Sequence, residues 1–264
     1  MQSAREAIEQ IRGRVRIPAT TGNRCPACNR ALIFHEGREF CFQCEVIAKE
    51  DAELAKAAIA DRERMKLKQL EKQFAAHSFI NPSLKEATFA KYNPPTESLY
   101  KAKAAVMGFV MNFDKEKPQN LLLAGSYGTG KSHLARAATI ELMQQGYSCM
   151  FISVPKLFAK IQESFNKNSS FSESQFISYL QSVDLLVIDD LGTEHYGKDT
   201  DGESWGHTKL FEILDGRAGR HTIYTTNLVE EALEDKVNGR NFSRILDNTE
   251  IIYMVGPDFR RKRK

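Results

Sequence analysis

The chain has 264 residues, 42% of them hydrophobic, which is enough for one sizeable domain with a buried core and a small second domain. Charged residues make up 27% of the chain, and it shows neither an apolar run of about 18 residues nor an apolar secretory leader, so we expect a cytoplasmic protein with no membrane partner. The 37 Lys and Arg residues nearly balance the 34 Asp and Glu residues, so net charge gives no argument for nucleic-acid binding.

Four of the five cysteines form two CxxC pairs near the start of the chain, Cys25 with Cys28 and Cys41 with Cys44, with 12 residues between the pairs. Each pair is a tight turn that offers two thiolates, so together they predict a structural Cys₄ zinc site in a reducing compartment. So short a segment buries too little surface to fold alone, and the metal would supply that free energy. His35 lies between the pairs and is an alternative ligand, although a surface position suits it better.

The cysteine pairs are followed by a segment that predicts a long helix. Residues 48–76 lack Gly and Pro and are rich in Ala, Glu, Lys and Leu, and most of this helix is polar all round. Such a helix is typical of a linker or a partner-binding element. Three prolines between positions 82 and 95 then mark a junction between domains. We therefore predict a zinc-binding module at 1–47, a helical linker at 48–80 and an ATPase domain at 81–264.

From residue 101 onward, helical patterns alternate with short apolar stretches. The stretches that predict strands are 121–124, 148–154, 185–188, 222–226 and 251–255. The helical patterns lie at 131–145, 155–166, 173–181 and 203–218. Short, continuously apolar strands between helices are typical of a parallel sheet that is covered on both faces, so the fold class is α/β. Cys149, inside one of these strands, is expected to be a core residue.

The strongest functional motif is a phosphate-binding loop. Residues 125–132 form a complete GxxxxGK[ST] pattern between a predicted strand and a predicted helix, and the predicted ATP-binding residues are Gly125, Ser126, Tyr127, Gly128, Thr129, Gly130, Lys131 and Ser132. The glycines let the backbone amides face the phosphates, and the helix N-terminus adds partial positive charge. Lys131 would reach the β- and γ-phosphates, and the Ser132 hydroxyl would ligate Mg²⁺.

Two further strands end in polar residues that suit the same site. The apolar run 185–188 leads into Asp189 and Asp190, which places Asp189 to hold Mg²⁺ with Ser132 and Asp190 to polarise the attacking water. The strand 222–226 ends at Asn227, which could orient that water and sense the γ-phosphate. Acidic and amide residues also cap strands without any catalytic role, and that reading is the alternative here.

These motifs occur in an order that resembles a known family. Residues 81–260 resemble the DnaC/DnaI helicase loaders and the related IstB transposition ATPases, in the motifs GSYGTGKSHLARA, VPKLFAKIQESF, SVDLLVIDDLGTE, TTN and GPDFR. The N-terminal cysteine module followed by a helix resembles the DnaI branch, whose N-terminal region engages the replicative helicase. The resemblance implies a P-loop AAA+ core that lacks the C-terminal helical lid of larger AAA+ proteins, and therefore no second sensor arginine from a lid.

The resemblance also implies nucleotide sites that are shared between self-associated subunits. An arginine from one subunit would complete its neighbour's site and stabilise charge on the transferring phosphoryl group. The segment GRNFSRI offers Arg240 and Arg244, and Arg244 matches the family position better. A surface salt bridge is the alternative role for either residue.

The family's extra helix after the second strand lines a channel for single-stranded DNA, which implies a contact surface here. It would offer Lys156, Lys160 and Lys167, while Phe165 belongs to an apolar pattern that favours core packing over base stacking. Trp205, near the start of a later helix, is either a DNA contact or an ordinary core residue. The basic residues 260–264 are either a solubilising end or a phosphate contact.

The leading functional hypothesis is an ATP-dependent bacterial or phage loader. Its N-terminal region would bind the hexameric replicative DNA helicase and help place it on single-stranded DNA, with ATP, Mg²⁺ and Zn²⁺ as cofactors. An IstB-like helper of DNA transposition is the alternative within the same fold. A small-molecule kinase would need a basic lid and an acceptor pocket, neither of which is evident, and a non-enzymatic adaptor would bind ATP without hydrolysing it.

Overall fold

The computed structural model describes residues 20–75, 81–166, 169–193 and 204–261, without the side chains of residues 63 and 66–75. The chain divides into two compact units, Met1–Lys68 and Gln69–Lys264, and each is described by itself. No helix in the described ranges is both long enough and apolar enough to cross a bilayer. The division into 1–47, 48–80 and 81–264 stays a prediction.

The first unit contains a small antiparallel sheet with the strand order β1-β2-β3. Its strands are β1 (Thr20–Arg24), β2 (Ala31–His35) and β3 (Arg38–Phe40). The turn between β2 and β3 places Glu36 and Gly37 at positive φ, which suits a tight hairpin. A short π-helical turn, η1 (Gln43–Ile47), leads into α2 (Ala48–Ala75), the long helix that the composition predicts. Every described side chain of α2 is exposed, in agreement with its polar pattern.

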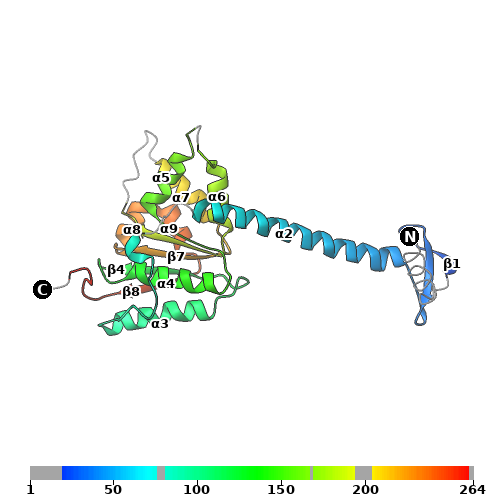
Figure 1. The fold of residues 1–264 in the computed structure, drawn as a ribbon, viewed down its shortest axis with the longest axis horizontal. Helices are drawn as coiled ribbons and strands as arrows, with labels where there is room; N and C mark the ends of the chain where they lie inside the picture. Colours follow the sequence, from blue (N-terminus) through cyan, green and yellow to red (C-terminus); the bar gives the residue numbers. More distant parts are fainter. Residues whose placement is uncertain (1–19, 76–80, 167–168, 194–203, 262–264) are drawn as a thin grey trace, which may run out of the picture. The chain divides into compact units, whose positions relative to one another are not determined.

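The second unit is built on a five-stranded parallel sheet with the order β5-β6-β7-β4-β8 (Figure 1). The strands are β4 (Asn120–Gly125), β5 (Cys149–Ser153), β6 (Leu185–Leu191), β7 (His221–Thr226) and β8 (Thr249–Met254). All five predicted strands are present. Because the strands are parallel, the residues that follow them gather at one edge of the sheet, where ligands bind in open α/β folds.

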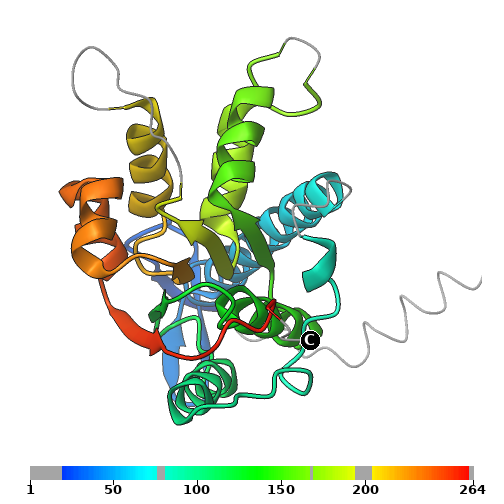
Figure 2. The same ribbon diagram turned by 90° about the vertical axis from the view of Figure 1, so that its left-hand side faces the viewer.

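Helices cover both faces of this sheet, as the apolar strands predict (Figures 1 and 2). After the turn η2 (Pro82–Leu84), α3 (Glu97–Met111) and α4 (Lys131–Gln144) lie on one face. The opposite face carries α5 (Val154–Glu163), α6 (Glu173–Ser182), α7 (Trp205–Asp215), α8 (Glu230–Val237) and α9 (Gly239–Leu246). Leu121 and Leu123 pack under α3 and α4, with Cys149 in the same cluster, and the alternate residue Leu122 is equally buried. The short helices α8 and α9, of eight residues each, were not predicted.

Local signals explain where several of these helices begin. The Thr96 hydroxyl accepts a hydrogen bond from the Leu99 amide at the start of α3. At the start of α6, Ser172 and Gln175 form a reciprocal capping box. A proline at position 155 occupies the first turn of α5, where its missing amide hydrogen costs nothing.

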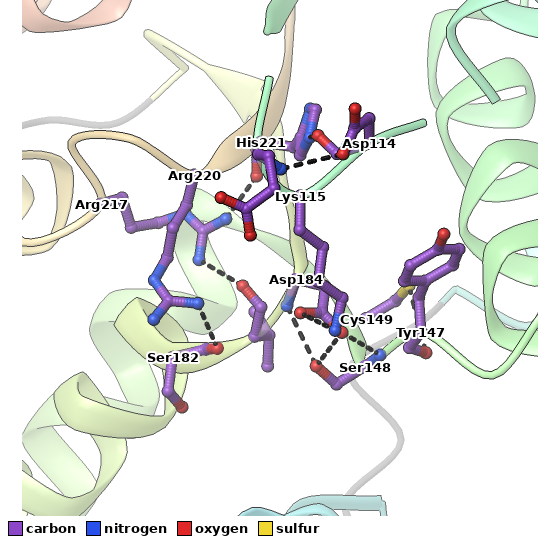
Figure 3. A network of polar contacts seen from close by, with 12 residues as sticks. Asp114, Lys115, Tyr147, Ser148, Cys149, Ser182, Asp184, Arg217, Arg220 and His221 are labelled. Atoms are coloured by element: carbon purple, nitrogen blue, oxygen red, sulfur yellow. Dashed lines mark hydrogen bonds and ion pairs between the residues drawn. The ribbon is translucent and has the colours of Figure 1, made fainter. Parts of the chain in front are cut away.

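A partly buried polar network joins the amino ends of the strands, at the edge opposite the strand tips (Figure 3). Asp184, just before β6, accepts hydrogen bonds from the Ser148 amide (2.9 Å) and the Ser148 hydroxyl (2.8 Å), just before β5. Arg217 is 3% exposed and donates to the carbonyls of Leu180 (2.7 Å) and Val183 (3.0 Å). Burial lowers the pKa of Arg217 to about 9, yet it stays a cation near neutral pH. These contacts fix the sheet from the end that is away from the candidate site.

Candidate nucleotide site and cysteine cluster

The phosphate-loop sequence forms a tight turn between the end of β4 and the start of α4. Gly128 and Gly130 adopt φ angles of +73° and +91°, in the left-handed region that favours glycine. A Cβ atom on Gly130 would lie 2.3 Å from the ring of Tyr92, so a side chain there would clash. The loop therefore presents its backbone at the N-terminus of α4, which is the geometry that binds anions.

Lys131 is held in this loop, with 5% of its surface exposed. Its ammonium group donates hydrogen bonds to the carbonyls of Gly125 (2.8 Å) and Ser126 (2.7 Å). Burial lowers its pKa to about 8, while the charges of Asp190 and Asp189 act in the opposite direction. At neutral pH the site therefore contains a buried cation with two carboxylates near it.

The two carboxylates come from the end of β6, where the pairing with β7 shifts register between Ile188 and Leu191. Asp189 is 4% exposed and accepts a 2.7 Å hydrogen bond from the Thr225 hydroxyl, which itself accepts a 2.9 Å bond from the Asp190 amide. Burial, followed by the charge of Asp190, raises the pKa of Asp189 to about 6, against the hydrogen bond from Thr225 that lowers it. Asp190 has a φ of +58°, a conformation that non-glycine residues seldom adopt. This irregularity in the strand allows the side chains of two consecutive acids, Asp189 and Asp190, to face one site.

A cleft of about 510 Å³ adjoins these residues, which is within the usual size of a small-molecule site. Its lining includes Lys131, Ser132, Asp190 and Asn227, which directly follows β7. Asp189 directly precedes Asp190 and lies close enough to Lys131 for its charge to act on the pKa of that lysine. The structure thus brings together Lys131 and Ser132 of the predicted phosphate loop, the two acids of β6, and the amide that was expected beside them.

Three further residues line the cleft: Tyr92 and Phe259, which were not predicted, and Arg260, for which a phosphate contact was one of two alternatives. The Tyr92 hydroxyl donates a 2.7 Å hydrogen bond to the Thr129 carbonyl, and the Phe259 amide donates a 3.0 Å bond to the Gly128 carbonyl. Arg260 lines the same cleft, and its charge contributes to the low pKa of Lys131. An arginine therefore reaches the cleft from the segment after β8 rather than from a lid. The GPDFR motif was the available signal, but contacts across so many residues leave no local pattern.

The two candidate trans-acting arginines lie elsewhere, on α9. The Arg240 guanidinium lies 3.5 Å from the centre of the Phe211 ring, and Arg244 forms a 2.7 Å ion pair with Asp215. Neither arginine lines the cleft of its own chain. An arginine in this position can serve a nucleotide site only in another subunit.

The candidate DNA contacts gather around α5 and the first turn of α7. Phe158 and Phe165 lie 5.7 Å and 6.1 Å from the Trp205 ring, between ring centres. Trp205 is half-buried, while Phe165 is 56% exposed. The expectation that Phe165 packs in the core is therefore wrong. Phe165 follows the end of α5 at Glu163, so it is no longer on the helix face that packs against the sheet. Lys156 is half-buried on α5, and Lys160 pairs with a glutamate one turn further on. Lys167 lies outside the described residues.

The four predicted zinc ligands form one cluster. The sulfur atoms of Cys25, Cys28, Cys41 and Cys44 all lie within 4.8 Å of one another, and none forms a disulfide. Four sulfurs on a tetrahedral zinc ion, each at about 2.3 Å, lie about 3.8 Å apart. The Cys28–Cys41 and Cys25–Cys44 sulfur distances of 3.4 Å and 3.9 Å match that spacing. His35 is exposed beside Glu36 and is not a member of the cluster.

Comparisons with known proteins agree with this architecture. Residues 60–264 match the family described as IstB-like ATP binding protein. The replicative helicase loader DnaC of Escherichia coli K12 is 33% identical over 199 residues, which cover 75% of this chain and 77% of that protein. The crystal structure of DnaI superposes with a TM-score of 0.57 at 24% identity, covering 68% of this chain and 94% of that one. AMPPCP-bound DnaA from Aquifex aeolicus superposes with a TM-score of 0.55 at 24% identity, covering 67% and 51%. The fold is that of a P-loop AAA+ core.

Proposed function

This chain belongs to the IstB-like ATP binding protein family, and on that premise we propose that it is an ATP-driven loader of a replicative DNA helicase. The proposal extends to this chain the role of the Escherichia coli relative, a replicative helicase loader. The observation that carries its enzymatic part is the convergence of Lys131, Ser132, Asp190 and Asn227 on one cleft, with Asp189 beside them. Its N-terminal region would bind the helicase, and the ATPase unit would help place that helicase on single-stranded DNA.

In the proposed ATPase, the amides of the loop from Gly128 to Lys131 bind the phosphates. The Lys131 ammonium group would give up its hydrogen bonds to the Gly125 and Ser126 carbonyls and donate to the β- and γ-phosphates instead. Asp190 polarises the attacking water and Asn227 orients it. Arg260 adds a second cation in the same chain, close enough to Lys131 to alter its pKa.

The donor set supports a magnesium ion held by Ser132 and Asp189. The Ser132 hydroxyl and the Asp189 carboxylate supply hard oxygen ligands, which Mg²⁺ prefers. When bound, the ion would neutralise charge that develops on the phosphate oxygens. The Thr225 hydroxyl holds the Asp189 carboxylate in place and favours its ionised form.

We further propose that subunits associate through AAA+ interfaces and that Arg244 completes a neighbour's site. Arg244 would exchange its ion pair with Asp215 for the phosphates, and its 43% exposed side chain is accessible for that. Arg240 is the alternative donor, although its guanidinium is stacked on Phe211. Single-stranded DNA would contact Lys156, Lys160 and Lys167, with Trp205 as the stacking residue.

The four-cysteine cluster supports a zinc ion that folds the N-terminal unit. Because all four ligands come from the protein, the ion would have a structural rather than a catalytic role. The β1-β2-β3 sheet and the exposed helix α2 would then form the docking element for the helicase. Phe34 and Phe42 are exposed in this unit and offer apolar contacts for a partner.

A size-exclusion and light-scattering experiment tests the loader hypothesis with the full chain. The protein is mixed with its cognate hexameric replicative helicase, with and without ATP and zinc. We expect co-elution that Cys41→Ser abolishes and Lys131→Ala retains, because docking depends on the zinc unit rather than on nucleotide turnover. Absence of any complex, with ATPase activity and DNA binding intact, would contradict the loader function.

That outcome would favour a helper of DNA transposition, the second candidate function, which the family description supports. The two functions share the nucleotide site and differ in partner. Binding to a transposase, measured in the same assay, would then replace binding to the helicase.

A further inference from the structure

Asn241, the residue after Arg240, is a completely buried polar side chain at the junction of three helices. It is 0% exposed, and its Nδ2 donates to the Val237 carbonyl of α8 (2.9 Å) and to the His207 carbonyl of α7 (3.0 Å). Its Oδ1 is buried with no hydrogen-bond partner in the described part of the chain. A buried amide with an unsatisfied oxygen costs free energy, and such a group in a folded protein calls for an explanation.

A hydrogen bond from the His207 side chain joins α7 to α8 at the same junction. The His207 ring lies with Nε2 2.9 Å from the Lys236 carbonyl, a contact in which Nε2 carries the proton and donates. His207 belongs to the first turn of α7, and its amide is held by the Ser204 hydroxyl. The first turn of α7 is therefore tied to the end of α8 directly by the His207 side chain and indirectly by Asn241 of α9, which bonds to both helices.

Further along α7, two side chains contact the arginines of α9. Phe211 and Asp215 are four residues apart on α7, as Arg240 and Arg244 are on α9, so each pair shares one face of its helix. Arg240 stacks on Phe211, and Arg244 pairs with Asp215. Asn241 lies on the inner side of α9, and these two contacts lie on its outer side. The position of the arginines thus depends on how α9 is seated on α7.

We propose that Asn241 is a positioning residue for the trans-acting arginine: it fixes α9 on α7, so that Arg244 reaches the nucleotide site of a neighbouring subunit. The inference rests on the proposed function of Arg244. An apolar residue of similar size would fill the same space and leave the helix free to shift or rotate. Since α7 begins at Trp205, the same link connects the candidate DNA contact with the arginines.

Subunit mixing tests the proposal with the full chain. Asn241→Leu is expected to lower ATPase activity roughly tenfold, within the hundredfold loss that a misplacement of about 1 Å can cause. Its affinity for a fluorescent ATP analogue should be unchanged, because Asn241 does not touch its own cleft. Addition of Lys131→Ala subunits, which lack a working nucleotide site but offer an intact arginine, should then restore activity to the Asn241→Leu sites.

Arg244→Ala mixed with Lys131→Ala is the matched control. Recovery in this control but not with Asn241→Leu would overturn the positioning role while leaving the trans-acting arginine in place. No recovery in the control would overturn the proposed function of Arg244, and the inference with it. If Asn241→Leu fails to fold, His207→Ala at a half-buried position removes the bond to Lys236 and leaves Asn241 in place. It should give a smaller loss that Lys131→Ala also rescues, and an unchanged activity would count against the proposal.

Discussion

Replacement of the magnesium candidate Asp189 by asparagine should abolish hydrolysis and, at the same time, stabilise the protein in the absence of nucleotide. The wild-type carboxylate is buried, and its pKa rises from 3.8 to about 6. A raised folded-state pKa means that ionisation opposes folding: the penalty is absent below the unfolded pKa and complete above the folded one. Asparagine has the same shape and can still accept the hydrogen bond from Thr225, but it carries no charge.

The size of this effect follows from the pKa difference. Each pKa unit corresponds to about 1.4 kcal/mol, so Asp189→Asn should raise the free energy of unfolding at pH 7 by about 3 kcal/mol. The gain should fall to about half near pH 5 and below about 1 kcal/mol near pH 4, because the wild-type residue is then protonated when folded. Denaturant unfolding at several pH values, followed by the fluorescence of the only tryptophan, Trp205, measures it.

Asp184→Asn is the matched control, with the opposite sign. Hydrogen bonds from Lys115 and Ser148 outweigh burial and lower the pKa of Asp184. Its ionised form therefore stabilises the fold above the unfolded pKa, and its removal should destabilise the protein at pH 7 and matter less as the pH falls. A pH-independent gain for Asp189→Asn, or no gain at all, would refute the reasoning, since burial of a charge would then not be the cause.

Three further changes should have separate effects. Thr225→Val removes the hydrogen bond to the Asp189 carboxylate, and a bond of this kind is worth about 1.5–3 kcal/mol. Its loss should raise the pKa of Asp189 by about one to two units, so the rising limb of the pH–rate profile should move to higher pH. A limb that does not move would exclude this contact from the mechanism. Trp205→Ala should weaken binding to an oligo-dT strand by about 1–3 kcal/mol in a fluorescence titration, whereas Tyr100→Ala, on an exposed part of α3, should not. Zinc chelation or Cys41→Ser should unfold the N-terminal unit, as limited proteolysis would detect, while ATP hydrolysis persists; resistance to the protease after metal removal would show that the cysteines do not hold a folding metal.

Much of the nucleotide site was predictable because its parts are local in sequence. A phosphate loop is one short segment whose glycines and lysine act together, and the strand before it and the helix after it have their own apolar periods. The acids of β6 and the amide after β7 were predictable for a related reason. Each ends an apolar strand, and parallel strands bring their carboxyl ends to one edge.

Other parts of the site were not predictable, because they depend on pairs of residues far apart in the chain. Tyr92 and Phe259 hold the phosphate loop from two sides, through single hydrogen bonds to Thr129 and Gly128. The bulge that turns Asp190 into the left-handed region has no sequence signal, since aspartate adopts other conformations more readily. The exposure of Phe165 was missed because its helical spacing continues past the point where the helix leaves the core.

By itself, the sequence determined the chemistry that this protein carries: a phosphate loop, paired acids, four cysteines with metal-ligand spacing, and an α/β order of elements. These properties are written in residue types and short spacings, and local physics is enough to interpret them. The tertiary structure alone decided which distant residues share a site. It placed Arg260 at the cleft, Arg217 among backbone carbonyls, and Asn241 between three helices. Such contacts arise when the whole chain packs, and their free energy depends on a burial that no short segment possesses.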